Sequence, residues 1–158
     1  MSKKDINSPR FDLIELFFFA YRDFTGDPDV LLDELGFGRA HHRVLHFVHR
    51  NPGIRVSDLL DILKITKQSL GRVLKQLVDE DFICQEPGAL DRRQRLLYTT
   101  EKGTKFCAQL SKLQTQRINK AISLMPDGSD DIVRQFLYLM IDENDRSEVA
   151  RLIGKETD

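Results

Sequence analysis

An apolar stripe between residues 70 and 78 constrains the fold more than any other feature of the sequence. Its members follow the i, i+3, i+4, i+7, i+8 spacing of one buried helix face: Leu70, Val73, Leu74, Leu77 and Val78. Thr66 precedes the stripe as a helix N-cap, and Ser57 caps a shorter helical pattern just upstream. Two β-type runs follow, at 82–85 and 95–99. The predicted order of helix, tight connection, helix and β-hairpin is that of a winged helix-turn-helix.

Helical patterns flank this unit on both sides, so we expect a mainly α-helical fold with a small β-hairpin wing. Apolar residues are so dense across 11–24 that this helix is expected to be covered on most sides. A second helix is expected at 39–50, since the Asn-Pro-Gly at 51–53 stops it. A long helix is expected from 100 to 122, and a last one after the break at 125–129.

Charge is distributed unevenly along the 158 residues, although the net charge is only −1. Residues 1–36 carry a net charge of −4, residues 37–125 carry +8, and residues 126–158 carry −5. A basic centre between acidic ends is typical of a protein whose middle binds a polyanion. Chance unevenness of surface charge is the alternative explanation.

Membrane, secreted and metal-binding classes are disfavoured. Cys84 and Cys107 show no CxxC or zinc-finger spacing, so we expect neither a disulfide framework nor a structural metal site. The most apolar N-terminal run, 13–21, contains Glu15 and is far shorter than the roughly 20 residues of a membrane span. No signal-peptide pattern precedes this run. We therefore expect a cytoplasmic protein with no membrane partner.

Enzyme classes find little support in the sequence. The chain has no Gly-rich phosphate loop, no HExxH and no nucleophile motif. Cys–His catalysis would require Cys84 or Cys107 to meet the histidines of helix 39–50, which nothing in the sequence predicts. We expect no enzyme activity and no cofactor.

The polar face of helix 67–79 is the first candidate DNA-binding surface. It carries Lys67, Gln68, Ser69, Gly71, Arg72 and Lys75. Gln68 can pair with adenine, and Arg72 can contact guanine or phosphate. Lys67 and Lys75 can neutralise phosphates, and Gly71 would let the duplex approach closely. The alternative is the ordinary solvated side of an amphipathic helix.

The hairpin loop is the second candidate surface, and it concentrates charge in "LDRRQR". Its candidate residues are Asp91, Arg92, Arg93 and Arg95. A narrowed minor groove attracts guanidinium groups, so Arg93 is predicted to enter it. Arg92 and Arg95 are predicted to contact the flanking backbone or to hold the wing's own structure. Asp91 repels phosphate, so we expect it to pair with a nearby arginine and fix the wing's shape.

The sequence from Val56 to Gly103 resembles the winged-helix core of the MarR (multiple antibiotic resistance regulator) family. The resemblance rests on "TKQSLGRVLKQL", on the wing motif Asp91-Arg92-Arg93 and on "LLYTTEKG", together with the flanking helices. Two features depart from the family: the apolar "EPGAL" before the wing motif, and Gly71 at a position often filled by a small hydroxyl residue. Both departures leave the operator sequence open.

The resemblance implies a homodimer with interlocked terminal helices, which binds a pseudo-palindromic operator and acts as a repressor. The apolar "LIELFFFAY" and the apolar final helix agree, since they expose more hydrophobic surface than one small domain can cover. A winged-helix module that binds only other proteins is the alternative. The implied organisation is an N-terminal dimerisation region at 1–36, a DNA-binding domain at 37–100 and C-terminal dimerisation helices at 101–158.

The resemblance also implies release of DNA by a small, aromatic or anionic effector. Weak candidates for binding it are Phe18, Tyr21, Arg22, His42 and His46. Packing in the core or in the dimer is the alternative role for these five residues, and the favoured one.

Metal and redox sensing are two further options. Metal sensing would use the cluster His41, His42, His46 and His49. We expect no metal site, because all four histidines lie on one helix and a site needs ligands from elsewhere. Redox sensing would need a reactive thiol, whereas Cys84 lies on a wing strand and Cys107 on an apolar helix face.

Overall fold

The computed structural model describes residues 8–154. Helices dominate, and a three-stranded antiparallel sheet in the order β1-β3-β2 is inserted among them. In chain order the elements are α1 (Phe11–Glu34), α2 (Arg39–Arg50), β1 (Ile54–Arg55), α3 (Val56–Leu63), α4 (Lys67–Asp79), β2 (Ile83–Pro87), β3 (Arg95–Thr99), α5 (Glu101–Ser123), α6 (Ser129–Leu139), the 3-10 helix η1 (Glu143–Asp145) and α7 (Arg146–Ile153).

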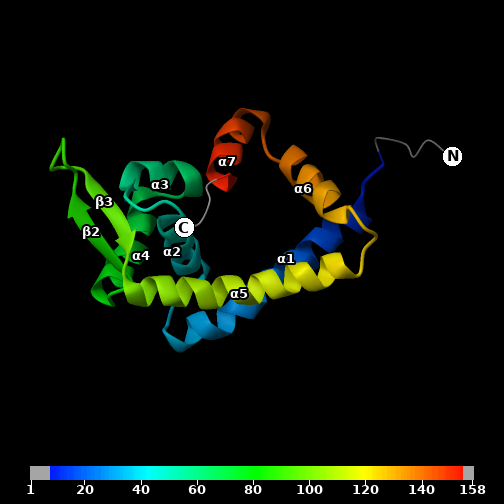
Figure 1. The fold of residues 1–158 in the computed structure, drawn as a ribbon, viewed down its shortest axis with the longest axis horizontal. Helices are drawn as coiled ribbons and strands as arrows, with labels where there is room; N and C mark the ends of the chain where they lie inside the picture. Colours follow the sequence, from blue (N-terminus) through cyan, green and yellow to red (C-terminus); the bar gives the residue numbers. More distant parts are fainter. Residues whose placement is uncertain (1–7, 155–158) are drawn as a thin grey trace.

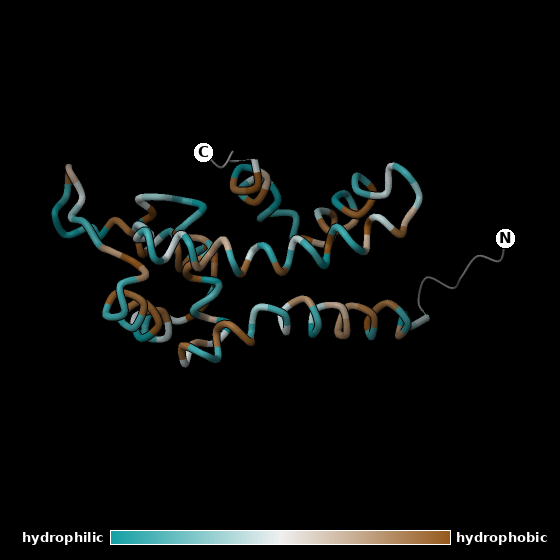
Figure 2. Tube along the Cα trace, turned by 60° about the horizontal axis from the view of Figure 1, so that its bottom comes forward, coloured by the Kyte–Doolittle hydropathy of each residue, from teal (hydrophilic) through white to brown (hydrophobic). Residues whose placement is uncertain are grey.

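The winged unit lies at one end of the molecule and the long helices extend from it (Figure 1). α1 and α5 run side by side along the long axis, as Figure 2 shows from a second direction. Arg117 of α5 joins them by donating to both carboxylate oxygens of Asp27, at 2.5 and 2.9 Å. α6 and α7 arch back over α5 towards α3 (Figure 1). Lys64, which follows α3, closes this arch through an ion pair of 2.5 Å with Asp145.

α1 extends ten residues beyond the predicted 11–24, and Pro28 lies inside it. Proline has no N–H to donate to the carbonyl four residues earlier, here that of Phe24. The side-chain amide of Gln114 on α5 donates to that carbonyl at 3.4 Å. The partner helix thus supplies the hydrogen bond that the sequence of α1 lacks, which no local pattern could reveal.

The core of the winged unit forms where the predicted stripe of α4 meets α2, α3 and the sheet. Leu70, Leu74 and Leu77 are buried, as predicted, and Val73 and Val78 pack partly buried against them. The other large, fully buried side chains of the unit include Val44, Leu45, Val48, Leu59, Phe82, Ile83 and Leu97. The amphipathic pattern of α4 therefore identified its buried face correctly.

The start of α3 corrects one sequence prediction. Arg55, not Ser57, is the N-cap residue, and no side chain caps the helix. The preceding Ile54–Arg55 pairs with β3 as the short strand β1, so the chain turns directly from the sheet into the helix. Arg55 and Asp58 form a two-point ion pair at 2.8 and 2.9 Å across the first turn. The predicted cap Thr66 is confirmed, since it accepts the backbone N–H of Ser69. Thr100 caps α5 in the same way by accepting from Gly103.

The sheet and the C-terminal region also differ in detail from the prediction. β2 runs from Ile83 to Pro87 rather than over 82–85, and β3 matches the predicted 95–99. The single last helix that we expected is two helices, α6 and α7. Arg146 satisfies carbonyl oxygens at the end of α6, donating to Ile141 at 3.0 Å and to Leu139 at 2.9 Å. Within the described residues, no helix is long and apolar enough to cross a membrane.

Candidate nucleic-acid interface

α4 presents its polar face to solvent, as predicted. Lys67, Gln68, Gly71, Arg72 and Lys75 are all exposed, while the leucines of the opposite face are buried. Lys75 forms an ion pair with Asp79 one turn later. The exposed face starts at the first residue of the helix, because the cap at position 66 fixes where α4 begins.

Ser69, predicted to contact DNA, forms two hydrogen bonds with Thr66 at the start of α4. Its backbone N–H donates to Thr66 Oγ1 at 3.1 Å, and its hydroxyl accepts from the same Oγ1 at 2.8 Å. The side chain is half-buried. Ser69 therefore stabilises the start of α4, and its contact with DNA stays a prediction.

The wing loop between β2 and β3 is closed by its own hydrogen bonds. The Gly88 N–H donates to Gln94 O at 2.9 Å, and the Gln94 N–H donates to Asp91 O at 3.1 Å. A side chain at Gly88 would meet Asp91 O at 2.6 Å, so only glycine fits there. These contacts give the loop one defined shape.

Asp91 shapes the wing as predicted, but with a different partner. Its Oδ1 accepts the backbone N–H of Arg93 at 3.0 Å, rather than a guanidinium group. This two-residue bond is the turn that an aspartate forms with its own backbone. The guanidinium of Arg95 donates to Gln85 Oε1 at 3.2 Å across the hairpin, which is one of its two predicted roles. Arg92 and Arg93 are exposed.

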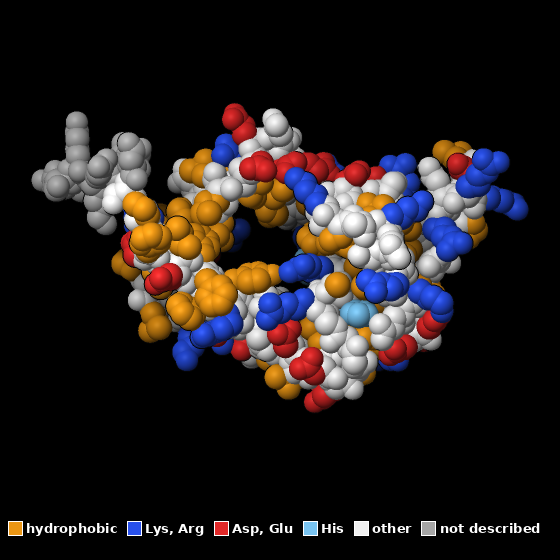
Figure 3. All heavy atoms as spheres, turned by 180° about the vertical axis from the view of Figure 1, so that it is seen from behind, with side chains coloured by type: hydrophobic (Ala, Val, Ile, Leu, Met, Phe, Trp, Pro, Cys, Tyr) orange, Lys and Arg blue, Asp and Glu red, His pale blue; other side chains and the backbone are white. Residues whose placement is uncertain are grey.

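A groove of about 750 Å³ lies between α4 and the wing. It brings together five predicted residues, Lys67, Gly71, Lys75, Arg93 and Arg95. The other five, Gln68, Ser69, Arg72, Asp91 and Arg92, lie outside its lining, on the same two elements. Seen from behind, Lys and Arg side chains gather at the wing end of the molecule (Figure 3).

Sequence reasoning missed the third wall of this groove, at the start of α3. Arg55 and Ser57 line it, together with Gln85 and Gln94 of the hairpin. The Arg55 guanidinium, through its hydrogen bonds, holds the pKa of Asp58 below its ordinary value, so this carboxylate stays ionised and paired. The helical pattern starting near position 57 was the available signal, but only the fold shows that it faces the wing.

The predicted effector residues do not form one pocket. Phe18, Tyr21 and Arg22 are exposed on α1, where the Tyr21 hydroxyl accepts from Arg43 at 2.8 Å. His42 and His46 are half-buried on α2, and burial lowers the pKa of both imidazoles. The role of these five residues in effector binding stays a prediction.

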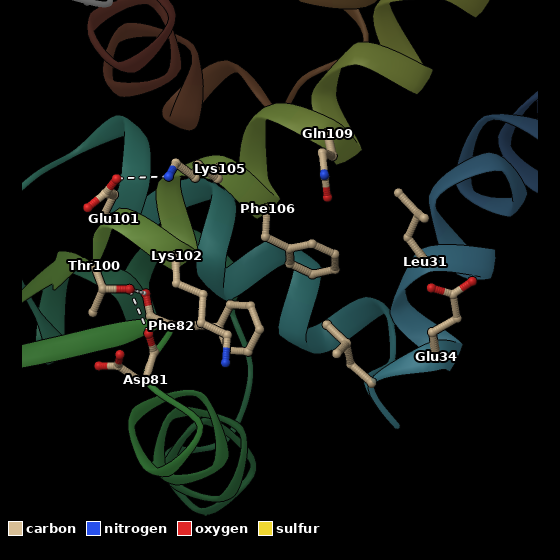
Figure 4. A pocket seen from close by; sticks show the side chains of 11 residues that line it. Leu31, Glu34, Asp81, Phe82, Thr100, Glu101, Lys102, Lys105, Phe106 and Gln109 are labelled. Atoms are coloured by element: carbon tan, nitrogen blue, oxygen red, sulfur yellow. Dashed lines mark hydrogen bonds and ion pairs between the residues drawn. The ribbon is translucent and has the colours of Figure 1, made fainter.

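A separate pocket of about 690 Å³ opens between α1, the N-terminal part of α5 and the turn that connects α4 to β2 (Figure 4). Leu31, Phe82 and Phe106 supply apolar walls, and Lys102 and Lys105 supply cations. The ammonium group of Lys102 lies 4.3 Å from the centre of the Phe82 ring and donates to Glu80 O at 2.8 Å. None of the five predicted effector residues lines this pocket.

His41 has a structural role on α2, and the two cysteines differ in exposure. His41 Nδ1 accepts the Gly38 N–H at 3.0 Å, and Nε2 lies 2.7 Å from Gln76 Oε1, so His41 connects α2 to α4. Among the described residues, no group of three or more His, Cys, Asp or Glu side chains could hold a metal ion. Cys84 is exposed and Cys107 is buried, and burial raises the pKa of the Cys107 thiol.

Two helices joined by a tight turn, followed by a hairpin on a small sheet, define a winged helix-turn-helix protein. A family model described as the MarR family matches residues 35–94. The HTH-type transcriptional regulator PetP of Rhodobacter capsulatus is 44% identical over 129 residues, which cover 82% of this chain and 78% of that protein. The chain belongs to the MarR family of transcriptional regulators.

Solved structures show the same fold. A crystal structure of MarR superposes with a TM-score of 0.67 at 22% identity, covering 98% of this chain and 100% of that one. A mutant MarR from E.coli, complexed with operator DNA, superposes with a TM-score of 0.64 at 20% identity, covering 85% of this chain and 100% of that one. The fold class predicted from the sequence is thereby confirmed.

Proposed function

We propose that this protein is a sequence-specific repressor that binds double-stranded DNA as a homodimer. The groove between α4 and the wing carries the proposal, because helix cations and wing arginines line the same groove. An α-helix of 10–12 Å diameter fits the major groove, which is about 12 Å wide. The wing then reaches the neighbouring minor groove, where Arg93 would contact it. The complex of E.coli MarR with operator DNA supports this mode of binding by analogy.

The roles of the individual side chains follow from their positions. Gln68 and Arg72 on the exposed face of α4 would read base edges, while Lys67 and Lys75 would neutralise phosphates. Gly71 offers close approach, since nothing lies within 4 Å of a Cβ built there. Arg92 would contact the DNA backbone, with Arg95 and Asp91 holding the wing in shape. We infer that the protein acts in a reducing cytoplasm, which suits its two free thiols.

The homodimer is supported by apolar surface far from the groove. Phe11, Ile14 and Phe18 of α1 are 65%, 60% and 65% exposed, and Ile132 of α6 is 66% exposed. Figure 3 shows hydrophobic side chains gathered at the end of the molecule opposite the wing. It also shows an opening beneath the arch that α6 and α7 form. A patch of this kind marks an interface. Segments 1–36 and 101–158 would form it, although residues 1–7 and 155–158 lie outside the described structure.

Two-fold symmetry determines the form of the operator. A symmetric dimer presents two winged units, so it recognises two inverted half-sites about one helical turn apart. The acidic terminal segments then lie in the dimer body, away from the phosphates, while the basic centre faces them.

The pocket in Figure 4 supports a response to an aromatic or anionic effector. Its apolar walls would hold an aromatic ring, and Lys102 would pair with a carboxylate. An anion there competes with Glu80 O for the Lys102 ammonium group. Because Glu80 is the C-cap residue of α4, the competition connects the pocket to the DNA-reading helix.

Benzoate serves as a probe of this response in a gel-shift assay with the full chain. We expect benzoate to release DNA from the wild-type protein. Lys102→Met loses the bond to Glu80 O, so it should bind DNA more weakly than wild type without benzoate, and benzoate should change its DNA affinity much less. Equal benzoate sensitivity of the two proteins would remove this pocket from the mechanism.

A gel-shift assay against random duplex DNA at two salt concentrations tests DNA binding itself. Selective retention of one sequence, with affinity that falls steeply with salt, is the expected result. Retention of no sequence would favour the alternative, a winged-helix module that binds only proteins. Light scattering at micromolar concentration should give the mass of a dimer, and a monomer would contradict the interlocked arrangement.

A further inference from the structure

Leu90 stands at the wing loop with its side chain fully in solvent, at 104% relative exposure. Its neighbour Ala89 is also exposed. Most other exposed large hydrophobic side chains lie on α1 and from the end of α5 through α6, on the surface assigned above to the dimer. Leu90 lies on the wing instead, among arginines. A leucine in this setting buries no apolar surface within its own chain, so its side chain is free to contact a partner.

The loop holds Leu90 in place and gives it no route to the interior. Gly88 and Gln94 pair through their backbones at the base of the loop, and Gln94 also donates to Asp91 O just after Leu90. Asp91 in turn accepts the Arg93 N–H. A Cβ built at Gly88 would lie 2.6 Å from Asp91 O, so the loop is folded tightly against this glycine. Leu90 is therefore presented to a partner in a conformation that is already fixed.

The charged side chains around Leu90 indicate which kind of partner it would contact. Arg92 and Arg93 follow it and are exposed, so the surface beside Leu90 is cationic and suits a polyanion. An apolar protein surface would leave these guanidinium groups unpaired at the interface. The minor groove of DNA satisfies both requirements, since phosphates border it and deoxyribose carbons form its walls. Minor-groove proteins insert Leu and other apolar side chains between base steps, so an apolar side chain in this groove has precedent.

We propose that Leu90 enters the DNA minor groove together with Arg93 and packs against its apolar walls. The proposal rests on the DNA-binding function given above and adds a contact that is independent of charge. Arg93 displaces counterions when it binds, whereas Leu90 displaces only water. Replacing Arg93 should therefore change the salt dependence of DNA binding, whereas replacing Leu90 should not.

Fluorescence anisotropy with the full chain separates the two contributions. The probe is a labelled duplex that the wild-type protein selects from random DNA, and the affinity is measured over a series of NaCl concentrations. Leu90→Ser should weaken binding roughly tenfold at every salt concentration and leave the slope of log affinity against log salt unchanged. Arg93→Ala should reduce that slope by about one. Leu90→Met, which keeps an apolar side chain, should bind within about twofold of wild type.

The outcomes distinguish this proposal from the function on which it rests. Equal affinities of wild type and Leu90→Ser would overturn the Leu90 contact while leaving DNA binding intact. A reduced salt slope in Leu90→Ser would also overturn it, because the substitution would then act by displacing Arg93. Failure of the wild-type protein to select any duplex would instead overturn the proposed function, and this contact with it. Thermal melts should match for all four proteins, since Leu90 and Arg93 are both exposed.

Discussion

A Cβ atom at Gly103 would lie 2.0 Å from the carbonyl oxygen of Phe82. The first turn of α5 thus touches the backbone that enters β2. Thr100 strengthens the junction, because its N–H donates to the same oxygen at 3.1 Å. The winged unit is therefore joined to α5 through backbone contacts. A change of side-chain rotamer cannot relieve a clash with backbone atoms.

Gly103→Ala should lower the free energy of unfolding by about 2–3 kcal/mol, because backbone atoms must move to admit the methyl group. Urea denaturation followed by circular dichroism measures the change. Gly26→Ala on α1 is the matched control, since nothing lies within 4 Å of a Cβ there. It should leave stability unchanged or raise it by up to about 1 kcal/mol. Equal midpoints for the two variants would contradict the close contact.

Thr66→Ala should destabilise the protein by about 1 kcal/mol, because the Ser69 N–H loses its cap. Thr66→Ser keeps an oxygen in place and should retain most of the stability. Since α4 would fray at the end that carries Lys67 and Gln68, we expect the alanine variant to bind DNA more weakly as well. If folded Thr66→Ala binds DNA as tightly as wild type, the cap contributes only to stability, and the expected link to DNA binding is contradicted.

Asp91→Ala should weaken DNA binding severalfold without changing the melting temperature. The substitution removes the acceptor of the Arg93 N–H, so the wing arginines lose their fixed positions. Asp91→Asn keeps an oxygen acceptor and removes a negative charge from the loop, so it should bind as well as wild type or better. Anisotropy titrations at one salt concentration compare the three proteins. Tighter binding by Asp91→Ala would show that the charge of Asp91 outweighs its shaping role.

Acid should destabilise the protein in part through His46. Burial lowers the pKa of His46 below its ordinary value of 6.5 in the folded state, with a smaller effect from His42. The unfolded chain then binds the proton more readily, so the stability contribution is complete above about pH 6.5 and is lost as pH falls through the folded pKa. His46→Gln should show a smaller loss of unfolding free energy between about pH 7.5 and pH 5.5 than wild type. Identical losses would exclude this residue as a source of the acid sensitivity.

Prediction from the sequence was most accurate for the elements that depend on local periodicity. The stripe of α4, its cap at Thr66 and the paired run 95–99 all appear as expected, since each depends on residues near in the chain. α1 extends past the predicted 11–24 and through Pro28, and the hydrogen bond that compensates for this proline comes from Gln114, distant in sequence. The two-residue strand β1 was missed because only its pairing with β3 makes it a strand.

The sequence predicted the exposed residues that α4 and the wing contribute to the candidate site, but not every surface that encloses it. Exposed cations on α4 and on the wing could be read from patterns, but the wall formed by Arg55 and Ser57 requires the fold. Asp91 was assigned the correct task with the wrong partner, since a backbone N–H two residues away leaves no charge signal in the sequence. The pocket of Figure 4 unites segments near residues 31, 82 and 102, which share no motif.

Selection from random duplex DNA, followed by affinity measurement at about 0.15 M salt, tests the central claim most directly. The full-length protein should enrich an inverted repeat with half-sites about one helical turn apart. It should bind this repeat at least about a thousandfold more tightly than a scrambled duplex of the same length. Absence of enrichment, or equal affinity for the enriched and scrambled duplexes, would contradict sequence-specific recognition by α4 and the wing.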